Sequence, residues 1–125
     1  MTQEEKLLLL KDLSGRSLYG VMIEITSDGG MVEASYDMRL DAGLLADLLH
    51  SEDDFKPYLR PLSSMTLEEK IELNAITKGV IQTIGLEDIV VTTDKGFDYL
   101  NEHHFDYRGL IPKGLALEAP EGMYD

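Results

Sequence analysis

The sequence predicts an α+β fold, in which a small antiparallel sheet built on a β-hairpin packs against two or three helices. The clearest observation is an alternating apolar stretch at about 18–26, an Asp-Gly-Gly turn, and a second alternating stretch at about 31–36. A second observation is a pair of Thr-x-x-Glu motifs, each placed before residues of helical spacing. The third is a glycine- and proline-containing C-terminal stretch, which is expected to run extended over the surface.

The first motif, Thr2 to Glu5, is expected to cap an N-terminal helix that ends at Ser14-Gly15, where glycine tolerates a left-handed turn. The residues expected to form its buried stripe are leucines, with two lysines pointing outward: Leu7, Leu10, Leu13 and the neighbouring Leu9, then Lys6 and Lys11. This helix and the hairpin would supply the first two elements of the domain.

The second motif, Thr66 to Glu69, predicts a helix that runs to about Ile84 and is softened at Gly79. Shorter helices are expected at 42–50 after Asp41 and at 95–103 after Thr93-Asp94. The segment 38–40 is also compatible with a third strand, and 89–92 is too short to classify.

The segment Lys56–Pro61 contains two prolines and cannot form a regular helix. Each proline biases the preceding residue towards extended geometry. We expect an ordered connector here, with Tyr58 and Leu59 available for packing.

At 125 residues and 43% hydrophobic content, the chain is expected to form a single domain, 1–125. It has no cysteine, which excludes disulfides and thiolate metal sites. No apolar run approaches the length of a membrane helix or a signal-peptide core. These features predict a cytoplasmic protein without a membrane segment.

The charge is strongly acidic, with 24 acidic against 11 basic residues and a net charge of −13. Such a chain is repelled by phosphate backbones, so direct nucleic-acid binding is not expected. The acids are spread along the chain, which favours a solvated surface. Mimicry of nucleic acid, to occupy a basic partner, is a sharper alternative interpretation.

The densest cluster of titratable groups lies at 102–108 and contains His103, His104, Tyr107 and Arg108. Adjacent histidines on a helix point about 100° apart, so they do not readily share one metal ion. Neither an HExxH nor an HxH motif is present. We therefore assign no catalytic residue, no metal site and no cofactor. A histidine at the C-terminal end of a helix is also explained without a function, because its positive form interacts favourably with the helix dipole.

Arg60 and Arg108 offer a different hypothesis. If they converge, their guanidinium groups could bind a phosphate or carboxylate, with Tyr58 or Tyr107 stacking on a base. The favoured alternative is that both arginines pair with local acids, such as Asp106, and fasten the C-terminal stretch to the body.

Two stretches resemble a known family. KPYLRPLSSMT at 56–66 and NEHHFDYRGLIPKGLALEAPEGMY at 101–124 are similar to a family of small uncharacterised proteins of gut Bacteroidales and their prophages and phages. The resemblance implies a bacterial or phage cytoplasm and an accessory role, and it carries over no catalytic residue.

We therefore expect a non-enzymatic binding or interaction protein with a protein or small-molecule partner. A binder of a phosphorylated or nucleotide ligand, including one that acts against a defence system, is the first alternative, and the nucleic-acid mimic is the second. The sequence leaves open whether the chain forms a homo-oligomer.

Overall fold

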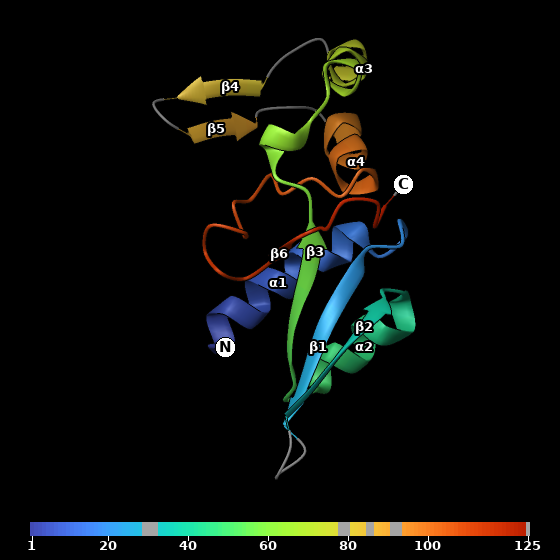
Figure 1. Ribbon diagram of the computed structural model, residues 1–125, viewed down its shortest axis with the longest axis vertical. Coiled ribbons are helices and arrows are strands. Elements are labelled where there is room, and N and C mark those ends of the chain that lie inside the picture. The colour runs from blue at the N-terminus through green and yellow to red at the C-terminus, as the bar shows by residue number, and fades with distance from the viewer. Residues whose placement is uncertain (29–32, 78–80, 85–86, 91–93, 125) are drawn as a thin grey trace.

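The fold is described by a computed structural model for residues 1–28, 33–77, 81–84, 87–90 and 94–124. Its larger sheet has the strand order β2-β1-β3-β6 (Figure 1). The strands are β1 (Met22–Asp28), β2 (Glu33–Arg39), β3 (Asp54–Leu59) and β6 (Leu117–Glu118). β1 pairs antiparallel with both β2 and β3, whereas β6 pairs parallel to β3. Together with the helices, this confirms the α+β prediction.

The helices are α1 (Gln3–Arg16), α2 (Ala42–His50), α3 (Leu67–Thr77) and α4 (Asp94–Glu102), with a 3-10 turn η1 (Leu62–Ser64). Both predicted capping boxes are present. The Glu5 N–H donates to Thr2 Oγ1 at 3.1 Å and the Thr2 N–H donates to Glu5 Oε1 at 2.9 Å. The second box is formed in the same way between Thr66 and Glu69. Asp41 caps α2 by accepting from the Leu44 N–H at 2.7 Å.

The hairpin is confirmed, but its strands are shifted towards the C-terminus relative to the predicted 18–26 and 31–36. The chain turns at residues 17–20, and Gly20 adopts a φ of 70°, so extended geometry starts only after this glycine. Met38, in the segment that was compatible with a third strand, belongs to β2. Gly29 and Gly30 of the expected turn lie outside the described residues.

α1 does not end at Ser14-Gly15 as expected but continues to Arg16. Gly15 lies against Asn101, where an added Cβ would stand 3.2 Å from the Asn101 side chain. Leu9 and Leu13 of the expected stripe are fully buried, together with Asp12 and Arg16, whereas Leu7 is exposed. Lys6, expected to point outward, donates to the carbonyl of Ser51 beyond α2. The leucine pattern therefore predicts part of the buried face of α1, and it misses the two buried charged residues.

The segment predicted as a connector, Lys56–Pro61, is a strand up to Leu59. The Leu40 N–H donates to the Val21 carbonyl at 2.8 Å, and these two residues continue the register in which β1 pairs with β2. Because hydrogen-bonded pairs alternate along an antiparallel ladder, the odd-numbered residues of β1 direct their N–H and C=O groups to β2. Pro57 stands opposite Ile23, one of these odd residues. Its missing N–H therefore removes no bond between β3 and β1.

The helix predicted from the second capping box is shorter than expected. α3 ends at Thr77, and Ile81–Ile84 forms strand β4, which pairs antiparallel with β5 (Glu87–Val90). β-Branched residues favour strands when a partner strand is available. Gly79 lies outside the described residues.

α1 and α2 cover one face of the larger sheet (Figure 1). The main core between them comprises Leu9, Leu13, Val21, Ile23, Ile25, Leu40, Leu48, Phe55, Leu59, Leu110, Leu115 and Ala116. A second cluster joins α3 and α4 to the chain that follows α4: Met65, Leu73, Tyr99, Leu100 and Phe105. The C-terminal segment, residues 103–124, contributes to both clusters and thus holds the two parts of the molecule together.

Candidate functional site

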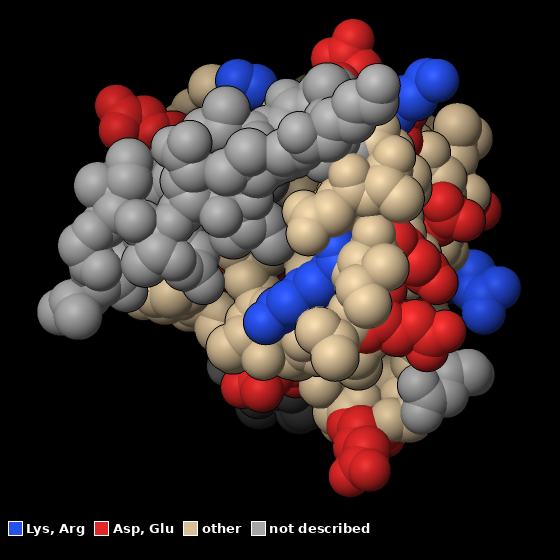
Figure 2. Space-filling view, turned by 90° about the horizontal axis from the view of Figure 1, so that it is seen from above, with Lys and Arg blue, Asp and Glu red and all other residues tan. Residues whose placement is uncertain are grey.

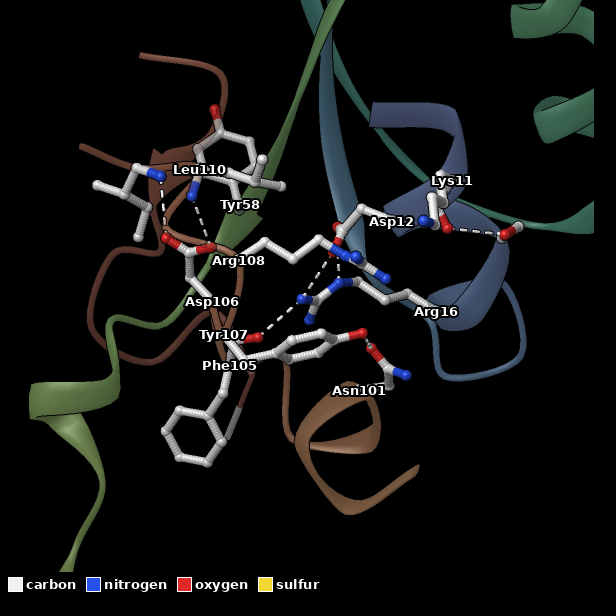
Figure 3. Close-up of polar contacts among 12 residues, drawn as sticks. Lys11, Asp12, Arg16, Tyr58, Asn101, Phe105, Asp106, Tyr107, Arg108 and Leu110 are labelled. Atoms are coloured by element: carbon white, nitrogen blue, oxygen red, sulfur yellow. Dashed lines mark hydrogen bonds and ion pairs between the residues drawn. The ribbon is translucent and has the colours of Figure 1, made fainter. Parts of the chain in front are cut away.

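A buried ion cluster joins α1 to the C-terminal segment (Figure 3). The Asp12 carboxylate is fully buried and accepts from Arg16 Nε at 2.8 Å, Arg16 Nη2 at 3.1 Å and Arg108 Nε at 3.1 Å. Arg16 is also fully buried and donates to the Phe105 carbonyl at 2.8 Å. The Tyr107 ring lies 5.1 Å from the Arg16 guanidinium and 5.2 Å from that of Arg108. We call Asp12, Arg16 and Arg108 the Asp12 cluster.

Arg108 therefore fastens the C-terminal segment, in agreement with the favoured interpretation, but its partner is Asp12 and not Asp106. Asp106 is occupied by backbone groups: its carboxylate accepts from the Leu110 N–H at 2.8 Å and the Ile111 N–H at 2.9 Å. Tyr107 donates its hydroxyl proton to Asn101 Oδ1 at 2.9 Å, which ties the segment to α4.

Arg60 ties the end of β3 to the start of α3. Its two terminal nitrogens donate to the two carboxylate oxygens of Glu69, each at 2.8 Å, and its guanidinium lies 4.2 Å from the ring of Phe105. The hydrogen bonds from Arg60 lower the pKa of Glu69 to about 2. Arg60 and Glu69 thus form a bidentate ion pair with little net charge.

The two histidines lie in different environments at the end of α4. His104 is 8% exposed, has a φ of 64° and stacks on Tyr124 with ring centroids 3.8 Å apart. Phe105 N–H donates to the Leu100 carbonyl and His104 N–H to that of Asn101, which is the Schellman arrangement at a helix C-terminus. Burial, together with the positive charge of Arg16, lowers the pKa of His104 to about 4, so this side chain is neutral at pH 7.

His103 is more exposed, and its Nδ1 lies 3.8 Å from Glu69 Oε2. Its ring packs against Tyr99 with centroids 4.2 Å apart. Within the described ranges, no group of three or more acidic or histidine side chains is arranged to hold a metal ion.

Tyr58 lies on the sheet face that does not contact α1 and α2. Its hydroxyl donates to Asp37 at 2.9 Å and lies 3.3 Å from Glu24, and the register places these two carboxylates directly opposite each other on β1 and β2. Burial and the neighbouring Asp37 raise the pKa of Tyr58 to about 12. The hydroxyl therefore bridges two acids that would otherwise repel each other.

A pocket of about 420 Å³ lies between η1, the start of α3 and the end of the C-terminal segment. We call it the acidic pocket, and its lining residues are Arg60, Pro61, Ser64, Thr66, Glu69, Glu118, Ala119, Pro120, Glu121, Gly122 and Tyr124. The stretches 56–66 and 101–124, which carry the family resemblance, meet here. Of the candidate residues that the sequence indicates, Arg60 alone is in this lining, and the others lie elsewhere: Tyr58, His103, His104, Tyr107 and Arg108.

The charge of the pocket comes from residues that the sequence pattern did not single out. Because Glu69 balances Arg60, the remaining charged groups of the lining are Glu118 and Glu121, both exposed. Tyr124 forms a fixed wall: its hydroxyl donates to the Tyr58 carbonyl at 2.6 Å and accepts from the Met22 N–H at 2.9 Å. The sequence does not indicate a pocket at residues 120–121, because only the fold brings these residues next to Arg60.

A second hollow of about 350 Å³ lies between α1 and α2 and is apolar, lined by Leu10, Ala42, Leu45, Ala46 and Leu49. It offers no polar group to orient a ligand. None of the helices in the described part of the chain has the length and apolar character to cross a bilayer.

No protein-family model, curated protein or solved structure matches this chain. The resemblance to proteins of Bacteroidales and their phages therefore stays a prediction.

Proposed function

We propose that this protein acts by binding a partner and not by catalysis, and that the acidic pocket receives a cationic side chain, lysine or arginine, of that partner. The observation that carries the proposal is the charge of the lining: Glu69 neutralises Arg60, which leaves the exposed carboxylates of Glu118 and Glu121 as the unbalanced charges of the lining. A cation is the group that these carboxylates attract.

The walls suit the same ligand. Pro61, Ala119 and Pro120 supply apolar surface beside the two carboxylates. Lysine and arginine side chains have an apolar stem and a charged head, so they bury the stem and leave the head near acids at the rim. The volume of about 420 Å³ is in the range of ligand pockets.

The overall charge of −13 supports a basic partner, because long-range attraction speeds the encounter of oppositely charged surfaces. A cytoplasmic partner, bacterial or phage-encoded, belongs to the same proposal. On the face in Figure 2, acidic side chains form separate groups among basic and other residues. This face does not carry the duplex-like double row of acids that nucleic-acid mimicry would need.

The alternative of a phosphorylated or nucleotide ligand is less favoured. It needs Arg60 and Arg108 together, but Arg60 is bound to Glu69 and Arg108 to Asp12, and Arg108 is not in the lining of the acidic pocket. A phosphate would have to displace a carboxylate from one of these pairs.

The test is the binding of a labelled lysine- and arginine-rich peptide, followed by fluorescence anisotropy. Changing Glu118→Gln and Glu121→Gln together is expected to weaken binding roughly three- to tenfold, since each exposed ion pair contributes up to about 1 kcal/mol. The control, Asp47→Asn with Asp98→Asn, removes equal charge at two exposed positions outside the pocket and should change binding less than about twofold.

Equal weakening by both double variants would show that only net charge matters and would contradict the pocket. A panel of nucleotides and inorganic phosphate, assayed by thermal shift, completes the test. A ligand at 100 times its Kd adds about 2.7 kcal/mol of stability, so a nucleotide that stabilises the chain where the peptide does not would favour the phosphate alternative.

A further inference from the structure

We propose that a second copy of this chain pairs with β2, antiparallel and about a two-fold axis at Tyr36, so that two sheets join into one. This inference concerns the opposite edge of the sheet from β6 and does not depend on the acidic pocket.

β2 is the outer strand of the sheet, because it pairs with β1 on one side and stands last in the strand order. Its seven residues pair with β1 in continuous register, without a bulge, and its sequence contains no proline or lysine. Bulges, prolines and charged side chains, lysine above all, are features that proteins use to block edge pairing, and of these β2 carries only the charges of Glu33, Asp37 and Arg39. Ser35–Arg39 are all exposed, so neither α2 nor another described segment covers this edge.

The hydrogen-bond phase of β2 is set by the bond from the Leu40 N–H to the Val21 carbonyl. Even-numbered residues of β2 direct their backbone groups towards β1, and the odd-numbered residues direct theirs outward. The N–H and C=O groups of Ser35, Asp37 and Arg39 therefore point away from the sheet. They form the regular ladder that a new antiparallel strand requires.

The side chains on the core face of β2 are incompletely covered. Tyr36 and Met38 stand opposite Ile25 and Ile23, which are buried, yet Tyr36 is 46% and Met38 is 41% exposed. The apolar face of the sheet thus extends beyond the part that the helices bury, at the edge formed by β2. A second β2, added here, would place its Tyr36 beside Tyr36 and its Met38 close by, extending the apolar face across the axis.

The strand sequence favours one register and a second copy as its occupant. An axis at Tyr36 uses all of Glu33–Arg39 and places Arg39 opposite Glu33 of the second copy, twice, and Asp37 opposite Ser35. Opposite charges at facing positions attract. An axis at Asp37 would place the two aspartates face to face, and an axis at Ser35 would oppose Glu33 to Asp37, so both are disfavoured. An axis at Met38 would place Asp37 opposite Arg39 of the second copy, but it would pair only residues 37–39 of β2 and is therefore the rival register.

The net charge of −13 on each copy opposes association. Repulsion between exposed charges is screened over about 8 Å at physiological ionic strength and over about 3 Å at 1 M salt. The dimer is therefore expected to strengthen with salt, in contrast to the binding of a basic peptide.

Sedimentation velocity of the full chain, from about 1 µM to about 1 mM and at low and high salt, tests the proposal. Arg39→Glu should weaken the dimer at least about tenfold, because it replaces two attractive pairs by repulsive ones. The control Lys56→Glu makes the same change in net charge on β3 and should leave the dimer intact. Glu33→Arg combined with Arg39→Glu should restore it, which fixes the register at Tyr36.

Hydrogen exchange gives a second readout that does not depend on the variants. In the wild-type chain, the amides of Ser35, Asp37 and Arg39 should exchange more slowly as concentration rises, while the exposed helix amides do not change. A wild-type chain that stays monomeric over the whole range, in both salts, would overturn the proposal. If the dimer were restored by Asp37→Arg with Arg39→Glu, and not by Glu33→Arg with Arg39→Glu, then Arg39 would face Asp37 and not Glu33. That result would overturn the register at Tyr36.

Discussion

Changing Asp12→Asn should destabilise the fold much more than the removal of an exposed carboxylate does. The Asp12 carboxylate is fully buried and accepts from Arg16 at 2.8 and 3.1 Å and from Arg108 at 3.1 Å. Without it, Arg16 keeps its full burial and its bond to Phe105 but loses its counter-charge. Removing one partner of a buried pair costs about 3–5 kcal/mol, because the other charge is left uncompensated. Domains of this size have about 5–15 kcal/mol in total.

Urea unfolding, monitored by circular dichroism, measures this loss. The control is Asp54→Asn, which removes the partner of the N-terminal ammonium in a pair whose Asp54 side chain is 58% exposed, and it should cost less than about 1 kcal/mol. The double change Asp12→Leu with Arg16→Met replaces the buried charges by apolar groups and should be more stable than Asp12→Asn alone. An Asp12→Asn protein within about 1 kcal/mol of wild type would refute the reasoning.

Acid should destabilise the fold through His104, whose pKa is lowered from 6.5 in the unfolded chain to about 4 in the fold. The unfolded chain therefore takes up a proton before the folded chain does, so the free energy of unfolding declines below pH 6.5 and levels off near pH 4. The total loss approaches about 3 kcal/mol. In the His104→Asn variant, the free energy of unfolding should change little between pH 6.5 and pH 4. The loss of stability below pH 4.5 that comes from the lowered pKa of Glu69 should remain in this variant. Tyr58→Phe should cost about 1–2 kcal/mol in thermal unfolding, because it removes the donor that bridges Asp37 and its facing acid, and an unchanged melting temperature would refute that role. Thr66→Ala should cost about 1 kcal/mol through the second capping box, and Thr66→Ser should retain most of it.

Much of the fold follows from local patterns. The hairpin, both capping boxes and the helix after Asp41 each depend on residues close together in the sequence, and each was predictable. The helix expected through Ile84 failed because a competing strand pairing, with residues 87–90, outweighs the helical spacing. The sequence contains both patterns, and their relative strength depends on tertiary contacts.

The candidate site was harder to predict. Asp12 and Arg16 have the spacing of an ordinary exposed pair on a helix. The pair is nevertheless fully buried, and its burial depends on long-range partners such as Arg108, 96 positions after Asp12. Both stretches that carry the family resemblance do line one pocket. The sequence did not indicate Glu118 and Glu121 within these stretches. Their carboxylates determine the charge of the pocket only because Glu69 neutralises Arg60.

The most direct test of the proposed function is an NMR titration of the labelled chain with the basic peptide. Amide shifts are expected to concentrate at Ser64, Thr66, Glu118 and Gly122, which line the acidic pocket, and added salt should reverse them. Shifts that appear instead around Arg108, or no shifts at peptide concentrations well above those of the protein, would contradict the proposed function.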